Sequence, residues 1–199
     1  MTQDLRRLVA AAAFAGAALF AAGCDQGKDD HAGHDHSKGG HDEAGQGKDG
    51  GGAKVAHAEI KDKDGKVLGQ VTFTEVEGGV KVEATVQGVA PGKHGFHIHE
   101  AGECSAPDFK SAKGHFNPDK KKHGGPTSEE RHAGDLGNIE VVADGSGKFE
   151  LTLKGLTVAD GDHSVVGKGL ILHAGEDDLT TDPTGNAGDR LGCGEIAKK

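Results

Sequence analysis

The chain has 199 residues, 34% of them hydrophobic, and a formal net charge of −9. This length allows one domain with extensions, and the acidic charge argues against a general nucleic-acid binder. Thirteen histidines in so short a chain indicate metal binding before other functions.

The first 23 residues have the organisation of an export signal. Arg6 and Arg7 form a basic start, and Leu8 to Ala22 is an apolar run too short for a comfortable membrane span. The run ends in small residues followed by Cys24, an order that resembles a bacterial lipoprotein signal in which the cysteine is lipidated. An ordinary secretory signal cut nearby is the alternative. Both interpretations predict an exported protein of the bacterial periplasm or cell envelope, and the first adds a membrane anchor through lipid on Cys24.

Residues 24–54 have low complexity, being rich in Gly, Asp, Lys and His and almost free of apolar residues. Such a segment buries too little apolar surface to offset the entropy lost on ordering, so we expect a disordered tether. Two roles stay open for it, a polar spacer and a loose metal-capturing segment, because His-rich tracts bind metals with little need for a fold. The histidines concerned are His31, His34, His36 and His41.

Residues 55–199 contain short segments with the two-residue alternation of β-strands, and none has a convincing helical period. They predict an all-β domain, an eight-stranded antiparallel Greek-key sandwich or flattened barrel. Two connections, 100–137 and 174–191, far exceed hairpin length, and loops this long are usually functional. The expected strands are Val55–Lys61, Val67–Thr74, Val80–Gly88, His94–His99, Asn138–Ala143, Lys148–Lys154, Lys168–His173 and Gly192–Ala197.

Histidines collect where the expected strands meet the two long loops. His97 and His99 are two apart on one strand, so both imidazoles point to the same face and can bind one metal ion. His173 ends another strand. These three residues with one further histidine would form a four-nitrogen site, which suits Cu(II).

The first long loop carries a second set of possible ligands. Three histidines and one carboxylate make a closed tetrahedral set, which suits a structural zinc ion. Two of its members are three residues apart, a spacing typical of ligands that one tight bend delivers. The set is His115, His123, His132 and Asp135.

The sequence around these ligands resembles the copper–zinc superoxide dismutase family over the whole expected domain. Segment 94–100 (HGFHIHE) is similar to the copper-binding strand of the family, and segment 185–194 (GNAGDRLGCG) is similar to its final signature. Its zinc loop is similar to segments 114–118, 123–126 and 132–138. The resemblance implies an enzyme that converts superoxide to oxygen and hydrogen peroxide by a redox-cycling copper ion with a structural zinc ion.

The resemblance also implies how the ligands divide between the two ions. One histidine, His115, would bridge both ions as an imidazolate, because the loss of its second ring proton needs two cations to compensate. Copper would be held by His97, His99, His115 and His173, and zinc by His115, His123, His132 and Asp135.

Five further residues match positions with a role in the family. Asp177 matches an aspartate that bonds one ligand of each metal and so fixes the ring orientations. Arg190 matches the arginine beside copper, a permanent cation where the anionic substrate docks. Cys104 and Cys193 match the family disulfide, while His94 matches a structural histidine with no metal role.

Two departures from the family bear on steering and assembly. The second long loop looks shorter than in animal enzymes and lacks their lysine–glutamate cluster, so steering must come from Arg190 and from lysines such as Lys120, Lys121 and Lys122. The tail 193–199 carries charges where animal enzymes have an apolar dimer contact, which leaves a monomer or a bacterial-type dimer.

Two other functions compete with dismutation. One is a metal-binding protein on the same fold without catalysis, which the fold alone does not exclude. A degenerate relative would be expected to lack a metal ligand or Arg190, and none of these is missing. The other is metal buffering by the histidine-rich tether, with the domain as its carrier.

Overall fold

The computed structural model describes residues 53–198. The predicted export signal, Cys24 and all but the last two residues of the histidine-rich tether lie outside the described residues. Within the described range, no helix is long and apolar enough to cross a membrane. Its elements are β1 (Val55–Lys61), β2 (Val67–Val76), β3 (Gly79–Gln87), β4 (Gly92–His99), the 3-10 helix η1 (Lys110–Ala112), β5 (Asp135–Val141), β6 (Ser146–Lys154), β7 (Gly169–His173), β8 (Arg190–Glu195) and β9 (Ala197–Lys198).

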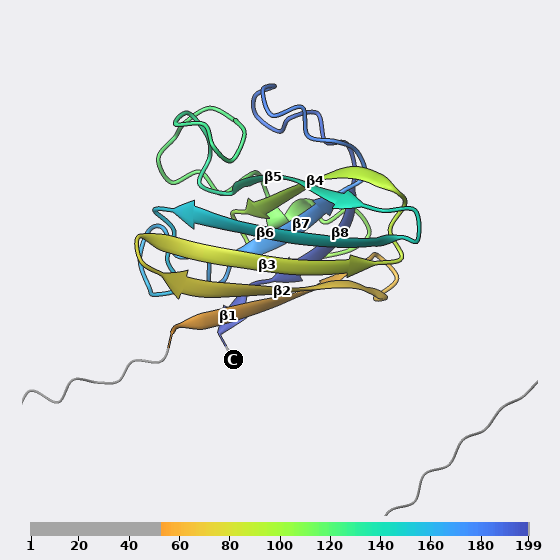
Figure 1. Ribbon diagram of the computed structural model, residues 1–199, viewed down its shortest axis with the longest axis horizontal. Coiled ribbons are helices and arrows are strands. Elements are labelled where there is room, and N and C mark those ends of the chain that lie inside the picture. The colour runs from red at the N-terminus through yellow and green to blue at the C-terminus, as the bar shows by residue number, and fades with distance from the viewer. Residues whose placement is uncertain (1–52, 199) are drawn as a thin grey trace, which may run out of the picture. The chain divides into compact units, whose positions relative to one another are not determined.

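Eight antiparallel strands close into a barrel, which confirms the predicted fold class (Figure 1). Their order around the barrel is β1, β2, β3, β6, β5, β4, β7, β8, and β8 pairs with β1 again. Because β3 and β4 are not neighbours, and neither are β6 and β7, these two connections cross between strands as in a Greek key. The short strand β9 adds to β1.

The two faces of β4 serve different purposes. Phe96 and Ile98 point into the barrel and belong to its main apolar core, with no exposed surface. His97 and His99 alternate with them and therefore point out of the barrel. They are nonetheless buried, with exposed fractions of 0% and 1%, because the long loops cover this outer face. The strands of the barrel thus form one side of this histidine site, and the long loops shield the other side from solvent.

Five strands begin one to three residues earlier than the sequence predicts, and two of these changes, in β5 and β8, concern the site. Strand β5 begins at Asp135 because that residue pairs with His97 across the sheet. Strand β8 begins at Arg190 because that residue pairs with His173. The last expected strand is interrupted at Ile196, whose backbone bonds Gly167 and Lys168 of the preceding connection. Hydrogen bonds between strands, which depend on the partner strand, decide these bounds.

The two long connections, 100–134 and 174–189, lie on the same side of the barrel, beside β4 and β5 (Figure 1). The first contains η1, which the sequence did not predict. A disulfide between Cys104 and Cys193, with a Cα–Cα distance of 5.5 Å, ties this connection to β8. The covering loop is therefore fixed covalently to the barrel wall.

Candidate metal centre

The first histidine set forms on the outer face of β4 and β7. His97 and His99 come from β4, and His173 is the last residue of the neighbouring strand β7. An isolated β-bridge between His99 and His115 brings the first long loop against β4. All four side chains are buried, and one ligand atom of each lies within 4.8 Å of the others.

The second set centres on the carboxylate of Asp135. Its Oδ1 lies 2.8 Å from Nδ1 of His115, 3.1 Å from Nδ1 of His123 and 3.2 Å from Nδ1 of His132. Its Oδ2 accepts the backbone N–H groups of His132 and Gly124, at 2.8 and 3.1 Å. All four members are buried with their ligand atoms within 4.8 Å of one another, and His115 belongs to both sets. The structure therefore brings together both groups of residues that the sequence singled out.

Each ring of the first set has one nitrogen anchored to an oxygen. Nε2 of His97 faces a carboxylate oxygen of Asp177 at 2.8 Å, and Nδ1 of His99 faces the Lys113 carbonyl at 2.9 Å. Nδ1 of His173 faces the Gly188 carbonyl at 3.2 Å. These oxygens only accept, so the anchored nitrogens carry the N–H in the neutral rings. The other nitrogen of each ring keeps its lone pair for a ligand.

The lone-pair nitrogens of the first set have no hydrogen-bond partner among the described residues. They are Nδ1 of His97 and Nε2 of His99, His115 and His173. Buried polar atoms without a partner are rare and costly, at about 1–3 kcal/mol each. Four that converge within one small region fit a bound metal ion, and four nitrogens suit copper. The second set, three histidines and one carboxylate, fits zinc.

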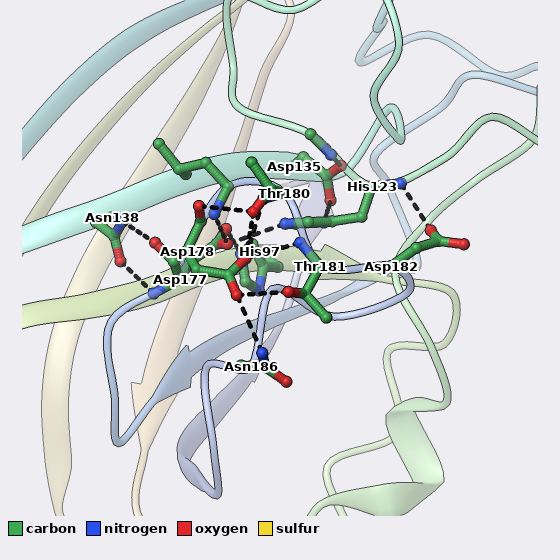
Figure 2. Close-up of polar contacts among 12 residues, drawn as sticks. His97, His123, Asp135, Asn138, Asp177, Asp178, Thr180, Thr181, Asp182 and Asn186 are labelled. Carbon is green, nitrogen blue, oxygen red and sulfur yellow. Dashed lines mark hydrogen bonds and ion pairs between the residues drawn. The ribbon is translucent and has the colours of Figure 1, made fainter.

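Asp177 joins the two sets through the second long loop (Figure 2). The carboxylate is almost fully buried; its Oδ2 faces His97 Nε2 at 2.8 Å, and its Oδ1 faces His123 Nε2 at 2.9 Å. The side chain of Asn138 bonds both the backbone N–H and the carbonyl of Asp177. Gly185 packs so closely that a Cβ there would lie 1.9 Å from Asp177 Oδ1. The contacts of Asn138 and Gly185 thus fix the position of the Asp177 carboxylate.

Burial holds the first set in its ligand form. It lowers the pKa of His115 to about 4, against the hydrogen bond with Asp135. It lowers the pKa of His173 to about 3, and the pKa of His99 also lies well below its usual value for the same reason. Neutral imidazole is the form that binds metal. At neutral pH these three rings are ready to act as ligands.

The carboxylates impose the opposite effect on His123. Burial alone would lower the pKa of this ring, but hydrogen bonds with Asp135 and Asp177 outweigh it and raise the pKa to about 10. Burial would likewise raise the pKa of both carboxyls, and the same histidine contacts hold them below their ordinary values. In the metal-free protein His123 is therefore a cation between two carboxylates.

Arg190 is fixed beside the first set by carbonyl groups of the disulfide-bearing loop. Its guanidinium donates to the carbonyls of Phe109 and Lys113, and the Lys113 carbonyl also faces His99 Nδ1. Both carbonyl residues have left-handed backbones, with φ of 53° and 64°. The sequence analysis missed Phe109 and Lys113 because a residue that acts through its carbonyl has no characteristic side chain.

Asp182 is a second functional residue that the sequence analysis missed. Its Oδ1 accepts the backbone N–H of His123 at 2.8 Å (Figure 2). The same oxygen lies 3.8 Å from His132 Nε2. The turn that carries it is organised by Asp178, whose carboxylate accepts bonds from Thr180, Thr181 and Asn186. An acidic residue in an acidic loop carries no distinguishing pattern, so only the fold identifies its partner.

The remaining predicted residues lie outside the two sets. Both ring nitrogens of His94 face backbone carbonyls, at 2.9 and 2.8 Å, so neither is available to a metal. Lys120, Lys121 and Lys122 are exposed on the first long loop. The ammonium of Lys121 donates to the Glu129 carbonyl at 2.9 Å. Their role in steering stays a prediction.

Comparisons with known proteins agree on one family. The family model described as Copper/zinc superoxide dismutase (SODC) matches residues 67–196. "Superoxide dismutase [Cu-Zn] 2" of Aquifex aeolicus is 42% identical over 146 residues, 71% of this chain and 85% of that protein. The "Copper chaperone for superoxide dismutase" of Rattus norvegicus is 41% identical over 74% of this chain and 53% of its own length. A double mutant of a SOD-like protein from Bacillus subtilis matches in structure with a TM-score of 0.66 and 37% identity, covering 71% of this chain and 96% of that one.

Proposed function

This chain belongs to the copper/zinc superoxide dismutase family, and from that premise we propose that it dismutates superoxide to oxygen and hydrogen peroxide. The observation that carries the proposal is the convergence of four buried, unpartnered ring nitrogens beside a fixed guanidinium. Such a site offers ligands for a redox-active ion and a cation for a small anion, and the reaction requires both.

The two residue sets divide the metals of the family between them. A bound copper ion would supply the one-electron change that oxidises one superoxide and reduces the next, while zinc, which keeps one redox state, would supply charge and shape. We assign copper to His97, His99, His115 and His173. We assign zinc to His115, His123, His132 and Asp135.

His115 is the proposed bridge between the ions. Its Nε2 is the unpartnered atom that belongs to the first set, while its Nδ1 lies 2.8 Å from Asp135 in the second. A ring without protons on either nitrogen is stable only between two cations. Nε2 is also the ring atom placed to hold a proton and return it to the reduced product.

Arg190 is the proposed docking cation for superoxide. The substrate is a small anion with little shape to recognise, so attraction must be mainly electrostatic. Two carbonyls hold the guanidinium in place, so that it is oriented before substrate arrives. The family also includes a copper chaperone, which makes metal binding without catalysis the alternative function.

The experiment is a dismutase assay on the full chain loaded with copper and zinc, beside two variants. His99→Gln removes one member of the copper set and should lose copper and activity while keeping zinc. His57→Gln, on the outside of β1, should match the wild type in metal content and rate. A wild type that holds both metals and yet shows no dismutation would favour the metal-binding protein without catalysis.

We propose further that the protein is exported and anchored in the bacterial cell envelope through lipid on Cys24. The lipoprotein-like pattern before Cys24 supports this location, and the Cys104–Cys193 disulfide suits an oxidising compartment. Replacing Cys24 with Ser should move the protein from the membrane fraction to the soluble fraction. Membrane retention of Cys24→Ser would count against the lipid anchor.

We also propose a monomer or a dimer of the bacterial type. The C-terminal strand β9 that carries Lys198 pairs with β1, and both of its residues are exposed. A charged and exposed strand is a poor centre for an apolar dimer contact. Sedimentation equilibrium of the metal-loaded protein tests this expectation, and a stable dimer that Lys198→Glu dissociates would contradict it.

A further inference from the structure

A groove of about 660 Å³ lies between the first long loop, the end of β6 and the β6–β7 connection. None of its lining residues belongs to the two histidine sets. Arg131 and Lys121 line it from the loop, and Thr152 and Lys154 line it from β6. We name it the Arg131 groove after its most buried cation.

Arg131 is half-buried and forms no ion pair with the residues that the structure describes. Its NH1 donates to the carbonyls of His132 and Ala133, at 2.8 and 3.3 Å, and no carboxylate of residues 53–198 forms an ion pair with it. A guanidinium has five N–H donors in a planar fork, and the other donors of Arg131 have no acceptor among residues 53–198. A cation placed this way gains from an anion in the groove.

The charges of the groove differ from those of the domain. From residue 55 onward the chain has 17 Lys and Arg against 24 Asp and Glu, a net charge of −7. The groove instead has three cations, Arg131, Lys121 and Lys154, against the two carboxylates of Asp119 and Glu129, a net charge of +1. Asp119 is moreover engaged by the ring of His163 at 3.1 Å.

We propose that the Arg131 groove binds a phosphate-type oxyanion, carried by a soluble phosphate ester or by a phospholipid headgroup. The guanidinium fork matches two oxygens of such a group and forms strong, charge-assisted hydrogen bonds. Lys154 adds a cation on the β6 side, and the side chains of Thr127 and Thr152 add hydroxyl donors. The groove is larger than one phosphate, which leaves room for the organic part of an ester.

The anion would also stabilise the neighbouring zinc set, and this second effect rests on the proposed function. Arg131 directly precedes His132, and its NH1 holds the carbonyls of the turn that leads to Asp135. An anion on the free edge of the guanidinium would fix that turn. Loss of zinc to a chelator should then be slower when the groove is occupied.

The test uses the full chain with Cys24→Ser, loaded with both metals, and inorganic phosphate as the probe in titration calorimetry. Arg131→Gln should weaken phosphate binding by about tenfold or more. Lys66→Gln, which removes an exposed cation outside the groove, should bind phosphate as the parent does. Because Arg131→Gln also removes bonds to the loop, Thr152→Glu provides a second variant that adds repulsion and leaves those bonds in place.

Two further measurements complete the design. Sedimentation with vesicles of phosphatidylglycerol, against phosphatidylcholine alone, distinguishes a headgroup from a soluble ester, and Arg131→Gln should weaken either kind of binding. Phosphate should slow zinc release several-fold in the parent and have no effect in Arg131→Gln. Equal phosphate affinity in the parent and both groove variants, or binding to neither probe, would overturn the proposal. Phosphate binding is read without the dismutase assay, so an inactive enzyme that binds phosphate at Arg131 would contradict only the proposed function.

Discussion

Asp177→Asn tests how one buried carboxylate serves two metal sets. The Oδ1 atom faces two donors, His123 Nε2 and the backbone N–H of Leu179, at 2.9 and 2.7 Å. Among residues 53–198, the Oδ2 atom faces only His97 Nε2, at 2.8 Å. The amide of asparagine has one accepting oxygen and one donating nitrogen. Asparagine keeps more of the hydrogen bonds of Asp177 when its oxygen takes the Oδ1 position. Its NH₂ group then faces Nε2 of His97.

The consequence is a change of tautomer at His97. Facing a donor, Nε2 must become the acceptor, and the proton moves to Nδ1, which is the unpartnered atom of the copper set. Loss of such an outer hydrogen bond typically weakens metal affinity or activity by about 10–100-fold. At about 1.4 kcal/mol for each factor of ten, this is roughly 1.4–2.8 kcal/mol. The loss should fall on copper more than on zinc, because His123 keeps its partner.

The assay is competition of the full chain with chelators of known affinity, for copper and for zinc separately. Asp162→Asn is the matched control, since it removes one carboxylate charge at an exposed position away from both sets. Affinities of Asp162→Asn should equal those of the wild type. If Asp177→Asn weakened zinc more than copper, the assignment of Oδ1 and Oδ2 to their partners would be wrong. If it changed neither affinity, the carboxylate would have no part in holding the rings.

Three further results are expected. Arg190→Ile should keep both metals and lower the rate of dismutation by about tenfold or more, with a weaker dependence of that rate on salt. Electrostatic steering in this family exemplifies such an effect. An unchanged rate and salt response in rapid kinetics would refute steering by Arg190. Lys113→Gly should be more stable than Lys113→Ala by about 1 kcal/mol in urea unfolding, because φ is 64° at this position and glycine adopts such a backbone more easily than alanine. Both variants lose the same charge, so the comparison isolates the backbone effect. Equal stabilities would show that the backbone is unstrained. Acid should lower the free energy of unfolding of the metal-free protein by about 1–3 kcal/mol per pH unit between pH 6 and 5. The folded-state pKa values of His115 and His173, about 4 and 3, lie below the unfolded value of 6.5, so the unfolded chain binds more protons over this interval. A free energy of unfolding that stays constant from pH 6 to pH 5 would contradict this expectation.

The sequence predicted the barrel because its information is local. Alternating segments and turn residues mark the strands, and β1 was predicted with the bounds that the structure has. The start of β5 was wrong by three residues, since Asp135 becomes part of a strand only through its pairing with His97. A strand bound depends on hydrogen bonds to a distant segment, which no local pattern contains.

In the candidate site, too, some residues could be predicted from local sequence patterns and others could not. Histidines and an aspartate in family motifs name the members of both sets, because only a few side chains bind copper or zinc. The groups that orient them were not predictable in full. Lys113 acts through its backbone carbonyl, which every residue has. Asp182 acts through its carboxylate, but it is one of several acidic residues in its loop, so no local pattern distinguishes it. The motif residues would hold the metals, while residues brought close by the fold, such as Lys113 and Asp182, orient the motif residues.

The charges of the two sets explain why their tasks differ. Copper would have four neutral nitrogen ligands, apart from the shared charge of a bridging His115, so its own charge stays largely uncompensated. Arg190 adds a second positive charge beside it, fixed by carbonyls. Zinc would instead receive the carboxylate of Asp135 directly. In a domain with a net charge of −7 from residue 55 onward, 17 cationic against 24 acidic side chains, a small anion is drawn only where positive charge exceeds negative. Because the copper set would have neutral ligands and the zinc set includes a carboxylate, the excess of positive charge would lie at the copper set, where the substrate must react.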